Sequence, residues 1–197
     1  MGFDSTGQLI QEIPWAGYFA RAGGLVAFLL LYFSIFFGLA IRLPILKNLL
    51  APVYSFSLHK IISVQAFIFV LLHVLFFFGD KYLDFGFKDI FVPFASVYKS
   101  EIVALGVFGM YIMFFLIIST YLRRFLTYAV WRAMHFLNII LYIFIVIHAY
   151  YLGSDLQGGY LQKIFIGLNI FLAIIFILAL IIKLKNAIMA KTNANLS

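Results

Sequence analysis

The sequence predicts an all-α integral membrane protein: a five-helix transmembrane bundle with its N-terminus outside and its C-terminus in the cytoplasm. Composition and charge pattern together lead to this class. Apolar residues make up 65% of the 197-residue chain, and only 11% of its residues are charged. A soluble domain averages about half apolar and about a quarter charged residues. The charged residues also fall between long uncharged stretches, so lipid is the expected surroundings of most of the chain.

Five uncharged stretches are the predicted membrane spans. They cover residues 22–41, 61–79, 102–122, 133–154 and 164–182 and contain 20, 19, 21, 22 and 19 residues. Because a helix needs about 20 apolar residues to cross a bilayer, each stretch is long enough for one span. The expected organisation is an outer-face N-terminal segment at 1–21, a membrane domain at 22–185 and a cytoplasmic tail at 186–197.

The segments between the spans differ in character. A short helix lying on the outer membrane face is expected within residues 1–20, because Trp15 and Tyr18 are residue types that favour the membrane interface. The connection at 42–58 is expected in the cytoplasm. The long connection at 80–101 is expected outside, packed on the bundle or the membrane surface, because it mixes charged residues with phenylalanines.

The distribution of charge sets the expected orientation. Nine basic residues and no acidic residue lie in the segments assigned to the cytoplasm, whereas five basic residues and all seven acidic residues lie on the other side. Cytoplasmic loops of membrane proteins carry such an excess of Lys and Arg. Topology therefore accounts for the net charge of +7, and nucleic acid is not an expected partner. The expected location is a bacterial inner membrane, crossed several times.

The four histidines occur in pairs, one pair for each of two predicted spans. His59 and His73 are 14 residues apart, and His135 and His148 are 13 apart. At a rise of about 1.5 Å per residue, these separations correspond to about 21 Å and about 19.5 Å. One span lies between the two histidine-bearing spans, so these run parallel. The pairs therefore match in depth: His59 with His135 near the cytoplasmic face, and His73 with His148 near the outer face.

An ionisable side chain inside a membrane span is costly and indicates a functional site. Zinc and copper sites gather their ligands at one point, whereas these histidines are divided between two depths. Parallel helices that each offer two imidazoles favour two stacked b-type haems, each with a histidine on either axial face. His59 and His135 are the predicted ligands of an inner haem, and His73 and His148 are those of an outer haem.

Helical rotation fits one histidine pair better than the other. At about 100° per residue, His73 lies within about 40° of His59 on an ideal helix, so both share a face. His148 lies about 140° away from His135 on an ideal helix. The second helix is therefore expected to contain a local overwinding or a bulge, or else the haems are offset sideways.

Two motifs carry the histidine pairs. One is Leu58-His59-Lys60-Ile61-Ile62-Ser63-Val64-Gln65, which runs on to Leu72-His73. The other is Tyr121-Leu122-Arg123-Arg124 followed by Trp131-Arg132-Ala133-Met134-His135 and Ile147-His148. These motifs resemble the two histidine helices of the ferric reductase-like transmembrane family, and residues 38–42 resemble the end of the family's preceding span. The resemblance covers roughly residues 23–183.

The resemblance implies a cytochrome b core that passes electrons between a donor and an acceptor on opposite sides of the membrane, as the electron-transfer component of an oxidoreductase. The family includes ferric reductases, NADPH oxidases and the haem subunit of the bacterial periplasmic methionine sulfoxide reductase. Ser63 stands where many members have glycine, and a serine there is expected to crowd a helix contact. A Gly-x-Gly-x-x-Gly fingerprint is absent, so flavin or NAD(P)H is expected only through a partner, with a separate redox donor or a quinol supplying the electrons.

Haem propionates are anionic, and cations near the membrane surface are expected to bind them. Arg132 lies three residues before His135 and shares its helical face. Arg132 and Arg124 are the predicted propionate partners of the inner haem. At the outer haem the candidates are Lys81, Lys99 and Tyr151.

Two other functions stay open on the sequence. One is the haem-binding membrane subunit of a periplasmic reductase, with a periplasmic acceptor protein docked at the outer loops. Members of that kind are expected to lack the histidine that matches His59, so its presence favours two haems. The other, from a different class, is a haem-free membrane transporter or assembly factor that uses its histidines for packing or for protons.

Overall fold

The computed structural model describes residues 15–41, 43–49, 51–80 and 82–194, and the regular secondary structure of these residues is helical throughout. Within this described part of the chain, five helices are long and apolar enough to span a membrane. The predicted class, an all-α bundle of five spans, is therefore confirmed. The orientation of the termini relative to the two membrane sides stays a prediction.

The first span begins earlier than the sequence predicted. α1, Trp15–Ala40, is one helix of 26 residues. The expected surface helix is therefore wrong for residues 15–20, and residues 1–14 lie outside the described part of the chain. No proline stands between Trp15 and Ala40, so nothing breaks the backbone hydrogen bonding of α1 before the membrane segment begins.

The next spans lie close to their predicted positions. α2, Pro44–Leu49, is a short helix in the first connection, and α3, Pro52–Phe77, is the second span. Pro52 opens α3 at its first turn, where the missing N–H would have no partner within the helix. In the second connection lies α4, Phe87–Phe91, followed by the third span, α5, Ser100–Tyr121.

The last two spans complete the bundle. After a 3₁₀ turn, η1 (Arg123–Phe125), the fourth span consists of α6, Tyr128–His135, and α7, Leu137–Leu152. A second 3₁₀ turn, η2 (Ser154–Leu156), leads to α8, Gly159–Ala194. The 36 residues of α8 correspond to about 54 Å at about 1.5 Å per residue, against about 30 Å of hydrocarbon core. The predicted span at 164–182 is thus only the central part of a longer helix.

The fourth span is interrupted directly after His135. The Phe136 N–H bonds to the carbonyls of Arg132 and Ala133 at 3.3 and 3.2 Å, and the Ile139 N–H bonds to Phe136 O at 3.1 Å. Bonds to the third preceding residue wind the chain at about 120° per residue instead of about 100°. Each residue wound in this way reduces the mismatch of about 140° between His135 and His148 by about 20°. Of the alternatives that the sequence left open, which were local overwinding, a bulge or a sideways offset of the haems, the structure shows local overwinding, and it lies at Phe136.

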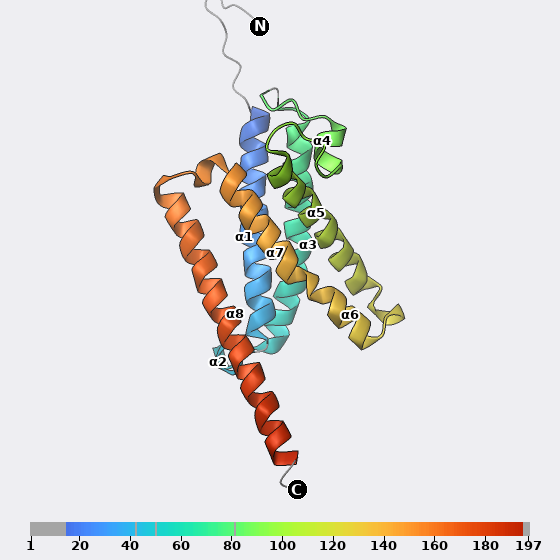
Figure 1. The fold of residues 1–197 in the computed structure, drawn as a ribbon, viewed down its shortest axis with the longest axis vertical. Helices are drawn as coiled ribbons and strands as arrows, with labels where there is room; N and C mark the ends of the chain where they lie inside the picture. The colour runs from blue at the N-terminus through green and yellow to red at the C-terminus, as the bar shows by residue number, and fades with distance from the viewer. Residues whose placement is uncertain (1–14, 42, 50, 81, 195–197) are drawn as a thin grey trace, which may run out of the picture.

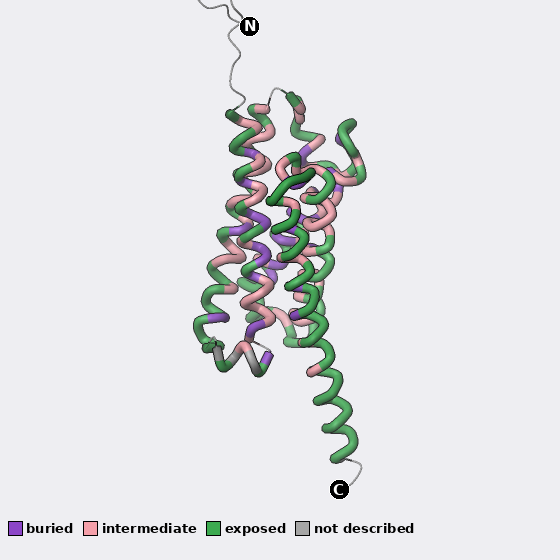
Figure 2. Tube along the Cα trace, turned by 90° about the vertical axis from the view of Figure 1, so that its left-hand side faces the viewer, coloured by how far each residue is buried: buried purple, intermediate pink, exposed green. Residues whose placement is uncertain are grey.

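The helices pack as two pairs, α1 along α3 and α5 along α7 (Figure 1). α8 lies at the edge of the bundle, where it contacts α1 and η2, and its C-terminal part continues beyond the other helices as an exposed rod (Figure 2). A cluster of buried residues from α1, α3, α5 and α7 fills the middle of the bundle: Leu31, Ala66, Met113, Leu116 and Leu141. This core fixes the four helices against one another at mid-depth.

Candidate functional site

Two pockets lie between the helices of the bundle, and each contains one histidine from α3 and one from the fourth span. His73 and His148 line one pocket, here called the His73–His148 pocket. His59 and His135 line the other, the His59–His135 pocket. The fold therefore brings together the same histidines that the sequence matched by depth.

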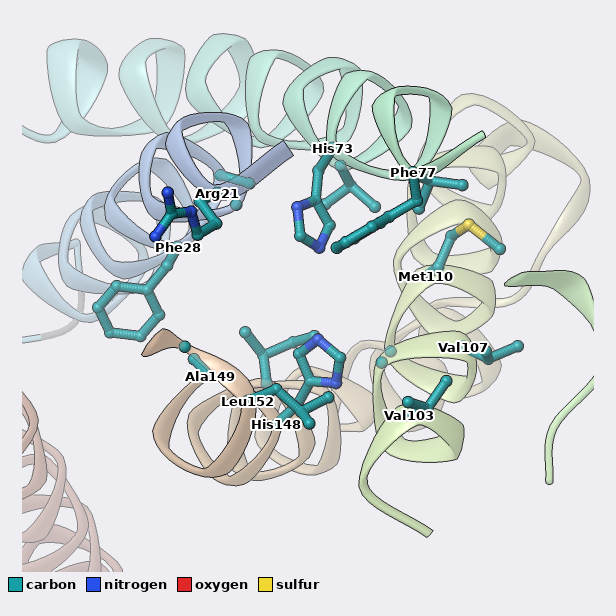
Figure 3. Close-up of a pocket in the computed structure, with 18 of the residues that line it drawn as sticks. Arg21, Phe28, His73, Phe77, Val103, Val107, Met110, His148, Ala149 and Leu152 are labelled. Carbon is teal, nitrogen blue, oxygen red and sulfur yellow. The ribbon is translucent and has the colours of Figure 1, made fainter. Parts of the chain in front are cut away.

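In the His73–His148 pocket the two imidazoles face each other across an open space (Figure 3). The cavity has a volume of about 190 Å³. Its walls are formed mainly by apolar side chains such as Phe28, Phe77 and Met110. Such walls suit a largely apolar ligand.

The ring nitrogens of three histidines are oriented by backbone carbonyls. His73 Nδ1 lies 2.6 Å from Ala20 O, His148 Nδ1 lies 2.9 Å from Ile102 O, and His59 Nδ1 lies 2.7 Å from Ser34 O. Since a carbonyl oxygen only accepts, each of these Nδ1 atoms carries the proton and donates it. The lone pair then sits on Nε2, which is the arrangement of a metal-ligating histidine.

The His59–His135 pocket is larger, with a cavity volume of about 470 Å³. The centroids of the His59 and His135 rings are 6.0 Å apart, and the ring planes are inclined by 73°. The two imidazoles are therefore close enough to hold one group between them.

His135 is held differently from the other three histidines. Its ring stacks on Trp131, with centroids 5.1 Å apart and planes inclined by 20°. The guanidinium of Arg123 lies over the Trp131 ring, 4.6 Å from its centroid. Asn138 Nδ2 lies 3.4 Å from His135 Nε2. Aromatic and cation contacts of this kind are directional, so they fix the plane of the His135 ring.

A short chain of hydroxyl groups connects α1 with α3 at His59. Ser63 Oγ donates to His59 O at 2.6 Å and lies 2.6 Å from Ser34 Oγ. Because the Ser63 proton is already used, the Ser34 hydroxyl donates to Ser63 Oγ. Ser34 Oγ also lies 3.1 Å from His59 Nδ1 and can accept part of its hydrogen bond. Ser63 therefore links two helices, and the expected crowding at this position is wrong.

The number of donor groups in each pocket distinguishes between classes of metal site. Among the residues that the structure describes, no three His, Cys, Asp or Glu side chains gather around one point. Two imidazoles alone leave a zinc or copper ion short of ligands. Haem, by contrast, brings its own four ring nitrogens and needs only the two axial positions. The donor set and the apolar walls of both pockets therefore fit haem.

The predicted cationic residues occupy different places. Arg132 lines the His59–His135 pocket, beside Trp131, whose buried Nε1–H has no hydrogen-bond partner among the described residues. This pocket thus offers an anionic group one cation and one neutral donor. Arg124 lies over its neighbour Phe125, 4.7 Å from the ring centroid, and is not among the described residues that line the pocket.

Arg21 is a residue that the sequence reasoning missed. It lines the margin of the His73–His148 pocket (Figure 3), donates to Ser154 Oγ at 3.1 Å and lies 3.5 Å from Asp155 Oδ1. Its position at the edge of the first predicted span was the feature of the sequence that could have indicated a role near this pocket. The direction of its side chain, however, depends on the early start of α1. Of the earlier candidates, Lys99 donates to Tyr151 O at 2.9 Å, and Lys81 lies outside the described residues.

Tyr142 connects the walls of the two pockets. It lines the His59–His135 pocket and stacks on Phe28 of the other pocket, with ring centroids 6.4 Å apart. Its hydroxyl donates to Asn169 Oδ1 at 2.7 Å, and Asn169 Nδ2 donates to Phe165 O at 2.7 Å. These bonds attach α8 to α7, so the polar Asn169 has a structural role.

Comparison with known proteins gives one family. A family model described as the ferric reductase like transmembrane component matches residues 23–146. The match includes His59, His73 and His135, ends two residues before His148, and is shorter than the resemblance of the motifs had indicated. No curated protein matches the chain.

Proposed function

The chain belongs to the ferric reductase-like transmembrane family, and from this premise we propose that it transfers electrons across a membrane through two b-type haems. The observation that carries the proposal is the grouping of the four histidines into two apolar pockets, one pair in each. The electrons come from a cytoplasmic partner or from a quinol and leave to an acceptor on the outer face.

In this proposal His73 and His148 hold one haem, and His59 and His135 hold the other. Bound haem supplies an iron that alternates between its ferric and ferrous states. The paired histidines would hold this group, and the mainly apolar walls would limit the access of water to it. Arg132 with the Trp131 Nε1–H is the proposed propionate partner in one pocket, and Arg21 is the proposed partner in the other. The role of Arg124 stays a prediction.

The proposed orientation follows the charge of the connections. Arg123, Arg124 and Lys60 lie at the end of the bundle that contains the His59–His135 pocket, whereas Arg21 and Asp155 lie at the other end. An excess of cations marks the cytoplasmic side, which makes the His59–His135 pocket the inner site. Electron entry is then proposed at this pocket and exit at the His73–His148 pocket, in a bacterial inner membrane.

The experiment that tests the proposal measures haem per chain and the reduced-minus-oxidised spectrum of the purified protein. Two b-type haems per chain are expected. His73→Ala and His148→Ala should each remove the same haem, and His59→Ala and His135→Ala should each remove the other. Gln65→Ala, at an exposed position of α3, is the matched control and should retain both.

Other outcomes have definite meanings. A protein that contains no haem after expression with ample haem supply refutes the electron-transfer proposal. One haem per chain refutes the two-haem form and favours the membrane subunit of a periplasmic reductase. Loss of both haems in each histidine variant, with the control intact, would contradict the assignment of one pair to each site.

A further inference from the structure

Three of the histidines share one local arrangement with a neighbouring helix. In each case the carbonyl that faces the histidine Nδ1 is followed, four residues later, by a glycine. The three carbonyl and glycine pairs are Ala20 and Gly24, Ser34 and Gly38, and Ile102 and Gly106. The first two pairs lie on α1 and the third on α5, so the arrangement occurs on two helices and in both pockets.

Each of these glycines lies so near the histidine ring that it accompanies that an added Cβ would meet the ring. A Cβ atom at Gly24 would lie 2.9 Å from His73 Nδ1, and one at Gly106 would lie 2.6 Å from His148 Nδ1. At Gly38 the corresponding distance to His59 Nδ1 is 3.3 Å. Carbon atoms in van der Waals contact are about 3.5–4.0 Å apart. The imidazoles of His73 and His148 therefore occupy space that an alanine methyl group would need.

The spacing of four residues has a geometric cause. In a helix the carbonyl of one residue bonds to the N–H of the fourth residue after it, and the side chain of that residue points back over the same carbonyl. A glycine there uncovers the side of the carbonyl oxygen. Since the oxygen has two lone pairs, it can accept the imidazole N–H as well as the helical N–H.

Not every helical glycine of the chain has this role. A Cβ at Gly109, three residues after Gly106 on α5, would meet Ile145 Cδ1 at 2.6 Å, and a Cβ at Gly167 on α8 would meet nothing within 4 Å. Contact with an imidazole is thus specific to a subset of glycines and is not a general property of the packing. The chain itself therefore provides matched controls.

We propose that Gly24, Gly38 and Gly106 are positioning residues that open one helical carbonyl each to the Nδ1–H of His73, His59 and His148. Each pair of carbonyl and glycine holds its imidazole in the tautomer whose lone pair is on Nε2, and directs Nε2 into the pocket. The role of Nε2 as an iron ligand rests on the proposed function, whereas the tautomer and ring position do not.

The test replaces each glycine by alanine in the full-length chain. The first readout needs no haem: ¹⁵N NMR of histidine-labelled protein reports which ring nitrogen carries the proton. The wild type should show three neutral imidazoles protonated at Nδ1. Gly106→Ala and Gly24→Ala should each remove one of these signals or shift it, while Gly38→Ala should have a smaller effect because its contact is longer.

The second readout uses the haem-loaded protein. Loss of the carbonyl bond makes the imidazole a weaker donor, so the midpoint potential of the affected haem should rise and haem affinity should fall by about 10–100-fold. Gly24→Ala and Gly106→Ala should alter one haem, and Gly38→Ala the other. Gly167→Ala should match the wild type. Gly109→Ala introduces a steric contact of similar size without touching a histidine, so it should leave the ring protonation unchanged.

The outcomes separate this inference from the proposed function. One outcome is that the wild type binds no haem but shows three rings protonated at Nδ1, with changes confined to the three glycine variants. This outcome would refute the proposed function and support the proposed role of the glycines. Wild-type haem binding together with glycine variants that match Gly167→Ala in both readouts overturns the inference alone. If Gly106→Ala and Gly24→Ala do not fold, Gly38→Ala decides, since its longer contact is the easiest to accommodate.

Discussion

The hydroxyl chain at His59 leads to a quantitative prediction about the contact between α1 and α3. Ser63→Ala removes the group that accepts the Ser34 proton, and Ser34→Ala removes the donor. Ser34 is only 3% exposed, so water does not replace the lost partner. In the Ser63 variant the Ser34 hydroxyl retains one alternative, a bond to a carbonyl of its own helix.

The expected coupling energy follows from the geometry. Hydrogen bonds between membrane helices contribute about 0.6 kcal/mol on average and about 1.7 kcal/mol at most. The bond between Ser34 and Ser63 is short, at 2.6 Å, and buried on the side of α1, which puts it in the upper half of this range. We therefore expect each single substitution to cost about 1 kcal/mol and the double substitution scarcely more, with a coupling of about 1 kcal/mol.

The assay is a double-mutant cycle of reversible unfolding in mixed detergent micelles. Ser57→Ala, at an exposed position of α3, is the matched control and should leave the free energy of unfolding unchanged. Additive effects of Ser34→Ala and Ser63→Ala, within about 0.3–0.5 kcal/mol, would refute the hydrogen-bonded link. The same variants should shift the midpoint potential of the haem proposed at His59, because Ser34 Oγ contacts His59 Nδ1.

Three further predictions concern the residues around the pockets. Arg21→Gln should lower the midpoint potential of the haem proposed at His73, because a cation that favours electron gain is lost. The control variant Lys163→Gln should leave this potential unchanged. Equal potentials in the two variants would contradict the assignment of Arg21. Arg132→Gln should lower the potential of the other haem in the same titration, and a shift of the wrong haem would exclude its propionate role. Tyr142→Phe should lower the free energy of unfolding by about 0.5–1.5 kcal/mol, because its hydrogen bond is lost. The variant should still bind both haems. Loss of haem would show that Tyr142 does more than join helices.

The sequence anticipated the spans and the depth of each histidine well. Depth along a helix is a local quantity, about 1.5 Å for each residue, so the spacing of His59, His73, His135 and His148 fixed which of them could share a pocket. The ends of the spans were less predictable. α1 begins at Trp15 and α8 continues to Ala194, because a helix ends where its hydrogen bonding is interrupted and not where its hydrophobicity stops.

The direction of side chains required the tertiary structure. The overwound turn at Phe136 rotates α7 relative to α6. Counting residues along an ideal helix could not locate this turn. Ser63 was expected to crowd a contact, yet it bonds across that contact because a serine of α1 happens to face it. Arg21 was overlooked because its partner Asp155 is far away in the chain.

The sequence by itself therefore determined the membrane class, the number of spans and the two depths at which histidines meet, since composition and helical rise depend only on neighbouring residues. The tertiary structure decided which carbonyl each histidine ring faces, which glycines make room for it and which cations reach each pocket. These features depend on how far each helix is rotated about its own axis, and that rotation is set by packing between segments distant in the chain.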